Sequence, residues 1–312
     1  MSLSITSNYA GKAAQSFIAP ALLNATSIAN EYVTIHTGVK YKFNLLLWSD
    51  TNMLQADGCS FNATGDITLT EKVLEPVHLK VNAEFCKTTL ESHWKSEEMR
   101  AGAMNSDAPT SFVSFLTSRI QGKIAEQVER LIWDGKTTGA TGIYITDPYM
   151  TLTNGLWPRA YADGSSVKVT GTAVNGTNAI DEIEKVYAAI SDKVFDNPSL
   201  KIFVPRQVYR AYQEALPTTY VANGNFDITK PQATTYKGIP VVFVGLANNH
   251  MIASIKDNLH VGTDLTGDFM EYRLLDMSEN DGSDNIRVKM RFSLDTNITN
   301  PAEIVVYGSP IV

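Results

Sequence analysis

The chain has 312 residues, a hydrophobic fraction of 44% and a charged fraction of 19%, a composition typical of a globular protein with a buried core. Its formal net charge of −7 at pH 7 disfavours tight nucleic-acid binding, because an acidic chain neutralises few phosphates. A local basic face stays possible. Two cysteines, Cys59 and Cys86, are too few for a disulfide framework, and we expect reduced thiols.

The sequence predicts neither export nor membrane insertion. No stretch approaches the roughly 20 continuous apolar residues that a spanning helix needs. Residues 1–10 lack the basic start and the apolar run of a secretory signal. The apolar run at residues 45–48 is too short to cross a bilayer, and we interpret it as a buried strand.

The first 33 residues are rich in Ser, Ala and Asn and carry few charges. Phe17, Ile18 and Leu22 recur at loosely helical spacing around Pro20. This pattern predicts an arm with short helical pieces that needs a partner surface to become ordered.

Residues 33–81 have a mostly extended pattern. Apolar residues alternate with polar ones over residues 67–70 and 77–81, and residues 58–66 are the predicted tip of a long hairpin. A lone hairpin is marginal in water, since ordering each residue costs about 1–2 kcal/mol while a fully buried Val, Leu or Ile returns roughly 1.5–3 kcal/mol. The hairpin should therefore pack either on its own body or on a neighbouring subunit.

A single long helix is predicted over residues 109–134, roughly 37 Å in length. Apolar residues recur at every fourth position along it: Phe112, Leu116, Ile120, Ile124, Val128 and Ile132. Charged residues fall elsewhere and are expected to face water or a partner: Arg119, Lys123, Glu126, Glu129 and Arg130. Pro109 suits the first turn and Gly135 the C-terminal cap.

An α/β region and a β-rich end follow a turn-rich linker. Helices are predicted over residues 178–195 and from Pro205, and strands over residues 200–204, 238–244, 251–255 and 259–262. Strands from residue 270 and from residue 286, joined by a turn at residues 280–284, form a predicted hairpin with one apolar and one charged face. A last strand is expected over residues 303–307.

The sequence predicts no catalytic residue, no metal ligand and no cofactor site. Asp134-Gly-Lys-Thr137 is best interpreted as a helix cap, because the phosphate-loop motif needs glycine where Arg130 stands and needs a preceding strand. The five histidines lack zinc-ligand spacing with each other or with cysteine. The adjacent carboxylates Asp181 and Glu182 point in different directions on a helix, and so do those at residues 97–98.

The stripe of Arg287, Lys289 and Arg291 on the charged face of the last hairpin allows several interpretations. It could contact nucleic acid, pair with Glu271 across the hairpin, or pair with acidic residues of a neighbouring subunit. Because the whole chain is acidic, we favour a solvated or intersubunit role.

Five segments, in chain order, resemble those of the major capsid proteins of tailed bacteriophages, which have the Hong Kong ninety-seven type fold. In that family they are the returning strand of an extended loop, the end of the spine helix with its glycine-rich exit, an axial strand-to-helix passage, a recurrent axial strand and a long peripheral hairpin. The corresponding residues here are 66–70, 131–139, 201–206, 238–242 and 276–292.

The resemblance implies an α+β capsid fold with four parts. These are an N-terminal arm with a lead-in strand at 1–39, an extended β-hairpin loop at 40–82, a peripheral domain at 83–142 and 266–296 with its spine helix at 109–134, and an axial domain at 143–265 and 297–312.

The resemblance also implies partners and location. Copies would assemble as pentamers and hexamers into an icosahedral shell, formed in the host cytoplasm and present in the virion, that encloses double-stranded DNA through weak contacts. A separate scaffolding protein would be a further partner, because the match begins within some forty residues of Met1. A portal and decoration proteins would be others. No Lys lies between Lys42 and Lys72, so we expect no covalent bond from the loop tip to a neighbour.

In such a shell the projecting apolar residues would lie on neighbouring subunits. We expect intersubunit contacts from the arm, the loop and the charged stripe, namely from Phe17, Ile18, Leu22, Ile67, Leu69, Val73, Arg287, Lys289 and Arg291. Two other functions stay open: an encapsulin-like nanocompartment shell that binds cargo, and an α/β enzyme of unknown chemistry built on residues 178–265. A β-rich adhesin or tail protein is a further alternative, which the long helix disfavours.

Overall fold

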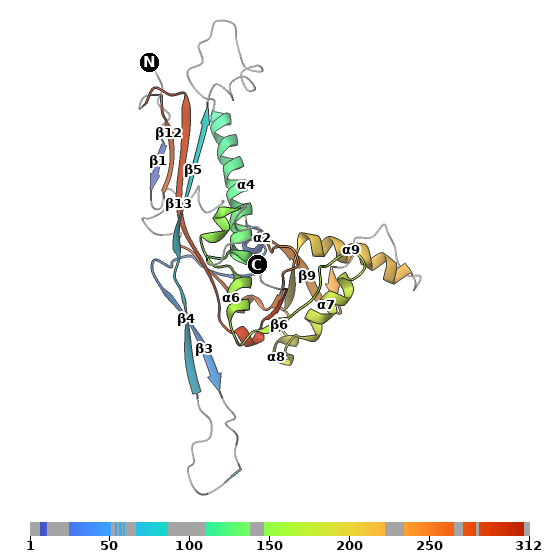
Figure 1. The fold of residues 1–312 in the computed structure, drawn as a ribbon. Coiled ribbons are helices and arrows are strands. Elements are labelled where there is room, and N and C mark those ends of the chain that lie inside the picture. The colour runs from blue at the N-terminus through green and yellow to red at the C-terminus, as the bar shows by residue number, and fades with distance from the viewer. Residues whose placement is uncertain are drawn as a thin grey trace.

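The computed structural model describes residues 7–10, 25–50, 54, 56–57, 59, 67–86, 110–137, 147–221, 234–264, 271–278 and 281–308. These residues form an elongated molecule (Figure 1). A long helix lies beside a sheet of long strands, a two-stranded hairpin extends beyond one end of that sheet, and an α/β body projects to one side. The predicted α+β class agrees with this architecture.

The first sheet has six strands and is built around one long strand, β13. The strand order is β1-β12-β13-β11-β2, and β5 pairs with β13 on its other edge. The strands are β1 (Ser7–Ala10), β2 (Thr34–His36), β5 (Val77–Cys86), β11 (Leu259–Gly262), β12 (Glu271–Asp276) and β13 (Asn285–Ile298). The predicted hairpin is β12–β13, which pair antiparallel from Glu271↔Arg291 to Asp276↔Ile286.

The long helix α4 (Thr110–Asp134) confirms the predicted helix within one residue at its start. Ile120, Ile124, Val128 and Ile132 are buried, as their spacing predicts, in one hydrophobic cluster with the apolar face of the first sheet. The side chains of residues 110–116 lie outside the described ones. Gly135 donates its backbone N–H to the Leu131 carbonyl at 3.2 Å, as expected of a C-terminal cap.

One charged residue of α4 does not follow the prediction. Glu129 was expected to face water or a partner, yet it is buried. Its carboxylate accepts hydrogen bonds from the backbone N–H and hydroxyl of Ser27 on the short helix α2 (Thr26–Ala29), from the Trp133 indole and from the Gly245 N–H. Four donors compensate the burial of this charge, a tertiary arrangement that helical periodicity cannot reveal.

The α/β body contains the second sheet, in the order β6-β14-β10-β7-β9-β8. Its strands are β6 (Val167–Val169), β7 (Lys201–Pro205), β8 (Thr235–Tyr236), β9 (Ile239–Val244), β10 (Met251–Ser254) and β14 (Val305–Tyr307). The helices around it are α6 (Leu156–Ala162), α7 (Ala179–Ala188), α8 (Asp192–Phe195) and α9 (Arg206–Val221). Short 3-10 turns are η1 (Pro148–Thr151), η2 (Lys256–Asn258) and η3 (Pro301–Glu303).

Most of the helices and strands predicted for this body are present, but one predicted helix is divided in two. The helix predicted over residues 178–195 is two helices, α7 and α8, because Ser191 has extended backbone angles and its hydroxyl caps α8 by accepting from the Lys193 N–H at 3.4 Å. A core of aliphatic residues between α7, α9 and the sheet holds the body together.

A buried polar group joins α4 to the α/β body. The Asp134 carboxylate, at the end of α4, is hydrogen-bonded to His250 Nδ1 at 3.0 Å and accepts from the Ala247 N–H at 3.2 Å. The His250 ring stacks on Trp157 of α6 with ring centroids 3.6 Å apart. These contacts fix how the helix meets the body.

The projecting hairpin consists of β3 (Phe43–Asp50) and β4 (Ile67–Leu74), which pair antiparallel along their full lengths. The next strand, β5, pairs with β13 of the first sheet, and it includes residues 77–82, which the resemblance assigned to the extended loop. The other domain boundaries stay predictions.

Candidate intersubunit surfaces

The two faces of the β3–β4 hairpin differ in what they contact. Directly paired residues of an antiparallel ladder lie on the same face. One face therefore carries Phe43, Leu45, Leu47 and their partners on β4, and we call it the inner face; the other carries Leu46, Trp48 and their partners, and we call it the outer face.

The inner face is attached to the body near the hairpin root. Leu74 is fully buried and Leu45 nearly so. Lys72 Nζ lies 2.6 Å from Asp163 Oδ2 at the end of α6, and both side chains are about three-quarters buried. Burial alone would raise the pKa of the Asp163 carboxyl, but hydrogen bonds from Lys72 and Ser165 outweigh it and lower that pKa.

Two further hydrogen bonds hold β4 against β13. Asn297 Nδ2 donates to the Val73 carbonyl at 2.7 Å, and the Glu75 N–H donates to Asp295 Oδ2 at 2.9 Å. Asp295 is itself buried and lies 2.6 Å from Arg159; burial raises the pKa of its carboxyl, and Arg159 partly opposes that shift. Strand β4 is thus fixed in direction where it leaves the body.

The outer face of the hairpin is open to solvent and carries four large apolar side chains, together with Asn44 and Glu71, which are hydrogen-bonded to each other at 3.1 Å. The solvent-exposed fraction is 55% for Leu46, 63% for Trp48, 55% for Leu69 and 38% for Val73. Scattered exposed apolar residues are ordinary, but these four lie on one face of two paired strands. Most of the large apolar residues that are exposed among the described ones lie between positions 41 and 77.

The structure brings together part of the predicted loop set. Leu69 and Val73 are on the outer face, as an intersubunit role requires, and the backbone of Ile67 pairs with Asp50, while its side chain is outside the described ones. Phe17, Ile18 and Leu22 of the arm also lie outside the described residues, so their role stays a prediction.

The sequence analysis missed Leu46 and Trp48. The prediction of a buried strand at residues 45–48 is wrong for these two side chains, although the strand itself is present. An apolar run cannot distinguish a strand buried on both faces from one whose second face awaits a partner. The alternation of exposure along β3 becomes visible only with the pairing register.

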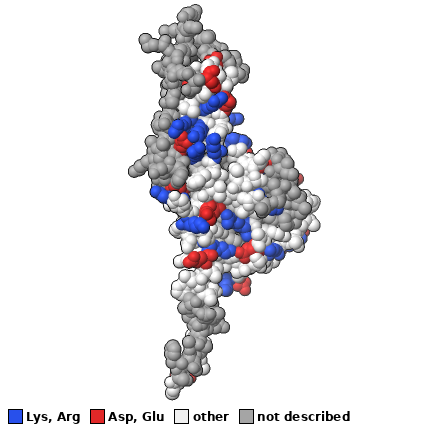
Figure 2. All heavy atoms as spheres, turned by 60° about the vertical axis from the view of Figure 1, so that its left-hand side comes forward, with Lys and Arg blue, Asp and Glu red and all other residues white. Residues whose placement is uncertain are grey.

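The polar face of the first sheet carries a cluster of cations around one carboxylate. Glu271 on β12 lies 2.9 Å from Lys289 Nζ and 3.7 Å from Arg291 on β13, and it also pairs with Arg273. Lys80 is opposite Arg291 on β5. Figure 2 shows Lys and Arg gathered on the upper part of this side of the molecule.

Glu271 is buried beneath the cations that surround it, whereas Arg291 is half exposed. The hydrogen bond from Lys289, with the charges of Lys289 and both arginines, lowers the pKa of the Glu271 carboxyl despite its burial. One carboxylate therefore orients three cationic groups without neutralising all of them, which leaves a basic surface on an acidic chain.

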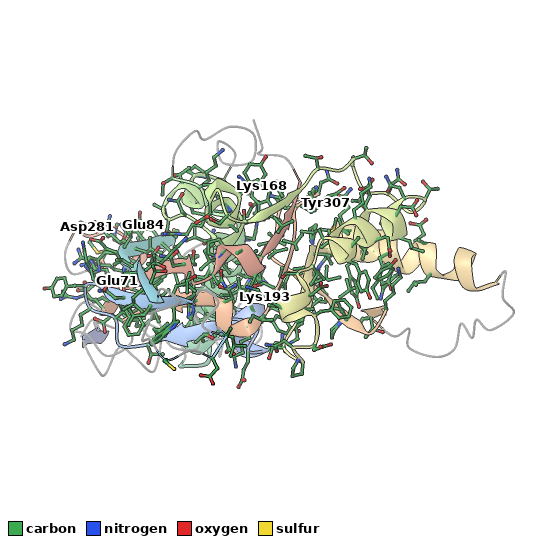
Figure 3. The ribbon with its side chains drawn as sticks, turned by 90° about the horizontal axis from the view of Figure 1, so that it is seen from below. Glu71, Glu84, Lys168, Lys193, Asp281 and Tyr307 are labelled. Carbon is green, nitrogen blue, oxygen red and sulfur yellow. The ribbon has the colours of Figure 1, made fainter. Side chains whose placement is uncertain are left out.

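Arg287, the third residue of the predicted stripe, is separate from this cluster. Its guanidinium pairs with Glu84 on β5 at 2.9 Å and approaches Asp281 in the β12–β13 turn at 3.6 Å. Glu84 and Asp281 lie near each other at one end of the molecule in Figure 3, away from Tyr307 in the α/β body. Of the three alternatives for the stripe, pairing with Glu271 holds for Lys289 and Arg291 and not for Arg287.

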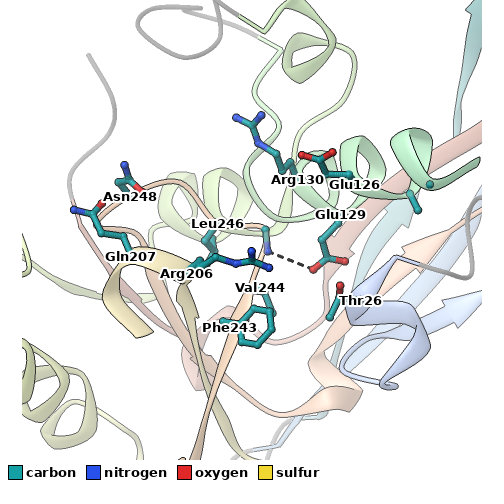
Figure 4. A pocket seen from close by; sticks show the side chains of 13 residues that line it. Thr26, Glu126, Glu129, Arg130, Arg206, Gln207, Phe243, Val244, Leu246 and Asn248 are labelled. Atoms are coloured by element: carbon teal, nitrogen blue, oxygen red, sulfur yellow. Dashed lines mark hydrogen bonds between the residues drawn. The ribbon is translucent and has the colours of Figure 1, made fainter. Parts of the chain in front are cut away.

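A hollow of about 620 Å³ lies between α2, α4, the start of α9 and the β9–β10 connection (Figure 4). Glu129 at its wall is occupied by four donors, and Arg130 pairs with Asp147 at 2.8 Å. Arg206 lies over the Phe243 ring, with its guanidinium carbon 5.3 Å from the ring centroid.

Within the described part of the chain, no group of three or more His, Cys, Asp or Glu residues could hold a metal ion. No helix among the same residues is long and apolar enough to cross a membrane. The surfaces that stand out are the outer face of the hairpin and the basic face of the first sheet.

The fold is that of phage capsid proteins. A chain of the satellite phage P4 procapsid, a structure that includes the size determination (Sid) protein, matches with a TM-score of 0.59 at 11% identity, covering 94% of this chain and 98% of that chain. The capsid of the native GTA particle matches with a TM-score of 0.60 at 13% identity, covering 92% and 89%.

A virus-like particle from Pyrococcus furiosus has the same fold, with a TM-score of 0.50, 11% identity and coverage of 95% and 98%. No protein-family model and no curated protein matches the sequence. At these identities the likeness establishes a common fold, and it confirms the resemblance to capsid proteins that five short segments indicated.

Proposed function

We propose that this chain is the major capsid protein of a tailed double-stranded DNA bacteriophage, whose copies assemble as pentamers and hexamers into a closed shell around the genome. The observation that carries the proposal is the hairpin that projects from the body with an apolar outer face. The shared fold with phage capsid chains over nearly the whole length supports it.

An exposed apolar face on a rigidly held projection is costly to leave in water. Trp48 alone leaves 63% of its area exposed. For a large aromatic side chain of about 250 Å² this is about 160 Å², worth about 4 kcal/mol on burial at about 25 cal/mol per Å². Since the root of β4 is fixed to β13 and α6, the hairpin does not fold back on its own body, and another copy is the natural cover.

Charge favours a second copy as that cover. Residues 43–75 contain five carboxylates and one lysine, whereas the basic face of the first sheet carries four cations around Glu271. An acidic projection and a basic receiving face are unlike patches, as the heterologous contacts of a ring require. Lys289 and Arg291 then serve as intersubunit residues together with Leu69 and Val73.

The enclosed DNA need not be gripped tightly. A net charge of −7 per copy means that packaged phosphates are balanced mainly by small cations. A scaffolding protein, a portal and decoration proteins belong to the same proposal as separate partners. The shell would be formed in the host cytoplasm and be a part of the virion, with no catalytic role.

A nanocompartment shell is the second candidate, which the likeness to the Pyrococcus furiosus virus-like particle favours. The two candidates differ in content. Particles of a capsid protein assembled in an infected host contain double-stranded DNA, whereas nanocompartment particles contain protein cargo. Absorbance at 260 nm and 280 nm of nuclease-treated particles separates them.

The test of a shell function is expression of the full chain, followed by light scattering during size-exclusion chromatography and by negative-stain microscopy. Rings or closed shells are expected. Boiled, reduced particles should run near 34 kDa, since the loop tip lacks lysine, and a ladder of covalent oligomers would contradict the non-covalent contact. A solitary monomer at high concentration, with or without enzymatic turnover, would refute the proposal.

A further inference from the structure

Two histidines meet through their ring nitrogens where the chain leaves the first sheet and starts the hairpin. His36 is the last residue of β2, and His260 lies on β11, the only strand with which β2 pairs among the described residues. His36 Nε2 and His260 Nδ1 are 3.1 Å apart. We propose that this pair is an acid-sensitive hinge, which holds the β3 side of the hairpin root at neutral pH and releases it when both rings carry a proton.

The two rings connect the body to the first residue of the hairpin. On the body side, His260 Nε2 is 2.5 Å from the hydroxyl of Thr299, which follows β13. On the hairpin side, the His36 ring lies against the ring of Phe43, the first residue of β3, with centroids 4.5 Å apart. The order of contacts is therefore Thr299, His260, His36, Phe43.

The hydrogen-bond inventory of the pair limits its charge. A neutral imidazole has one N–H and one acceptor nitrogen, so one proton lies between the two facing nitrogens. A first additional proton fits on the far nitrogen of His36, which then still donates to His260. A second one, on His260, makes both facing nitrogens donors, and at 3.1 Å they repel. Both nitrogens of His260 are already engaged, so this ring has no other site for the proton.

The surroundings of the pair oppose that second proton. Burial, followed by the charge of His36, lowers the pKa of His260 to about 4, and burial lowers the pKa of the partly buried His36. Asp257 in η2 is the carboxylate that acts in the other direction. The neighbouring Lys256 is engaged with Glu31 at 2.9 Å, and Asn297, opposite His260 on β13, is neutral.

Release would be confined to one side of the hairpin root. The attachments of β2 and of the residues after it are few. Three residues pair with β11, the Thr263 N–H donates to the His36 carbonyl at 2.9 Å, and the Thr34 hydroxyl donates to the Lys256 carbonyl at 3.3 Å. Beyond β2 there are the isolated bridge from Gly38 to Asp264 and the Val39 N–H on the Thr263 carbonyl at 3.2 Å. The β4 side keeps its attachments through Lys72 and Val73. Loss of the histidine contact therefore lets the hairpin swing about β4 rather than detach, which changes where its outer face points.

The experiment follows the histidine rings and the hairpin root in the full unassembled chain, with Leu69→Asp as the background if the parent chain assembles. His36→Gln keeps a neutral hydrogen-bonding group near the Nε2 position and cannot titrate. His78→Gln, which removes an exposed histidine from β5, is the matched control. Assembly is not needed, so the result is independent of the proposed shell function.

Ring chemical shifts between pH 7.5 and 4 should show His36 titrating before His260, and His260 should bind its proton at least tenfold more weakly than a free imidazole. Hydrogen exchange in residues 34–43, corrected for the intrinsic rate, should rise at least tenfold from pH 7 to pH 4.5, while β10 and β14 stay protected.

His36→Gln should remove most of that rise, and His78→Gln should leave it unchanged. A His260 that titrates near pH 6.5, or a parent chain whose residues 34–43 stay protected at pH 4.5, would overturn the hinge. If His36→Gln does not fold, these two measurements on the parent chain still decide the matter.

Discussion

Leu69 offers the sharpest test of the outer face, because the substitution Leu69→Asp changes assembly without disturbing the monomer. Its side chain is 55% exposed and contributes little to the isolated fold. Replacing an exposed residue of this kind alters the free energy of unfolding by about 0.5 kcal/mol or less. The melting temperature of the monomer should therefore change by less than about 2 °C.

The cost appears only when the outer face is covered. Burying the exposed half of a leucine contributes about 1–1.5 kcal/mol per contact. A carboxylate pressed against apolar neighbours adds a desolvation cost of a few kcal/mol more. A loss of about 3 kcal/mol per contact weakens each one more than a hundredfold, and a ring repeats that loss at every contact.

Thr68→Asp is the matched control for this substitution. Thr68 is adjacent on β4, pairs with Ser49 and lies on the inner face, so the variant carries the same new charge pointing the other way. Light scattering and negative-stain microscopy should find shells or rings for the parent chain and for Thr68→Asp, and monomers for Leu69→Asp. Normal particles from Leu69→Asp, or an equal defect in both variants, would refute the reasoning.

Three further predictions concern stability, each measured by thermal or denaturant unfolding. Glu129→Gln should lower the free energy of unfolding by about 1–3 kcal/mol, since an amide cannot accept from all four donors, whereas Glu126→Gln on the same helix should change it little. Gly245→Ala should cost at least as much, because a Cβ there would lie 2.8 Å from the Glu129 backbone, and Gly164→Ala, in open space, should not. The pKa of His260 is about 4 in the folded chain and 6.5 in the unfolded chain. Between pH 6.5 and pH 4 the folded chain therefore binds fewer protons than the unfolded chain, and the free energy of unfolding falls as the pH is lowered through this range. By pH 5 the loss should be about 1–2 kcal/mol, and a flat profile from pH 7 to 5 would contradict the burial of that ring.

Local sequence patterns predicted the helices and strands that have strong periodicity. They failed to predict the burial of side chains whose partners are distant in the sequence. The fourfold spacing of Ile120, Ile124, Val128 and Ile132 located α4 correctly, because a helix buries one stripe whatever it packs against. The burial of Glu129 was not predicted, since three of its four donors come from α2 and from the β9–β10 connection. Only the Trp133 indole lies on α4 itself, and the spacing of residues along a helix cannot reveal the three distant donors.

The sequence indicated only the β4 residues of the outer face, for a similar reason. Leu69 alternates with threonines and stands out as a strand residue with one apolar side. Trp48 lies in a continuous apolar run, in which core and interface have the same composition. The His36–His260 contact joins positions 224 residues apart, and no spacing rule connects them.

Strand β13 gives the molecule a mechanical property. It runs without interruption for 14 residues, a span of about 45 Å. It begins near the turn that contains Asp281, and near its other end Asn297 donates a hydrogen bond to the Val73 carbonyl at the hairpin root. The first part of β13 pairs with β12 on one edge and with β5 on the other, and hydrogen bonds on both edges restrict its bending. The turn at one end of the subunit and the root of the hairpin at the other are therefore joined by a single paired strand.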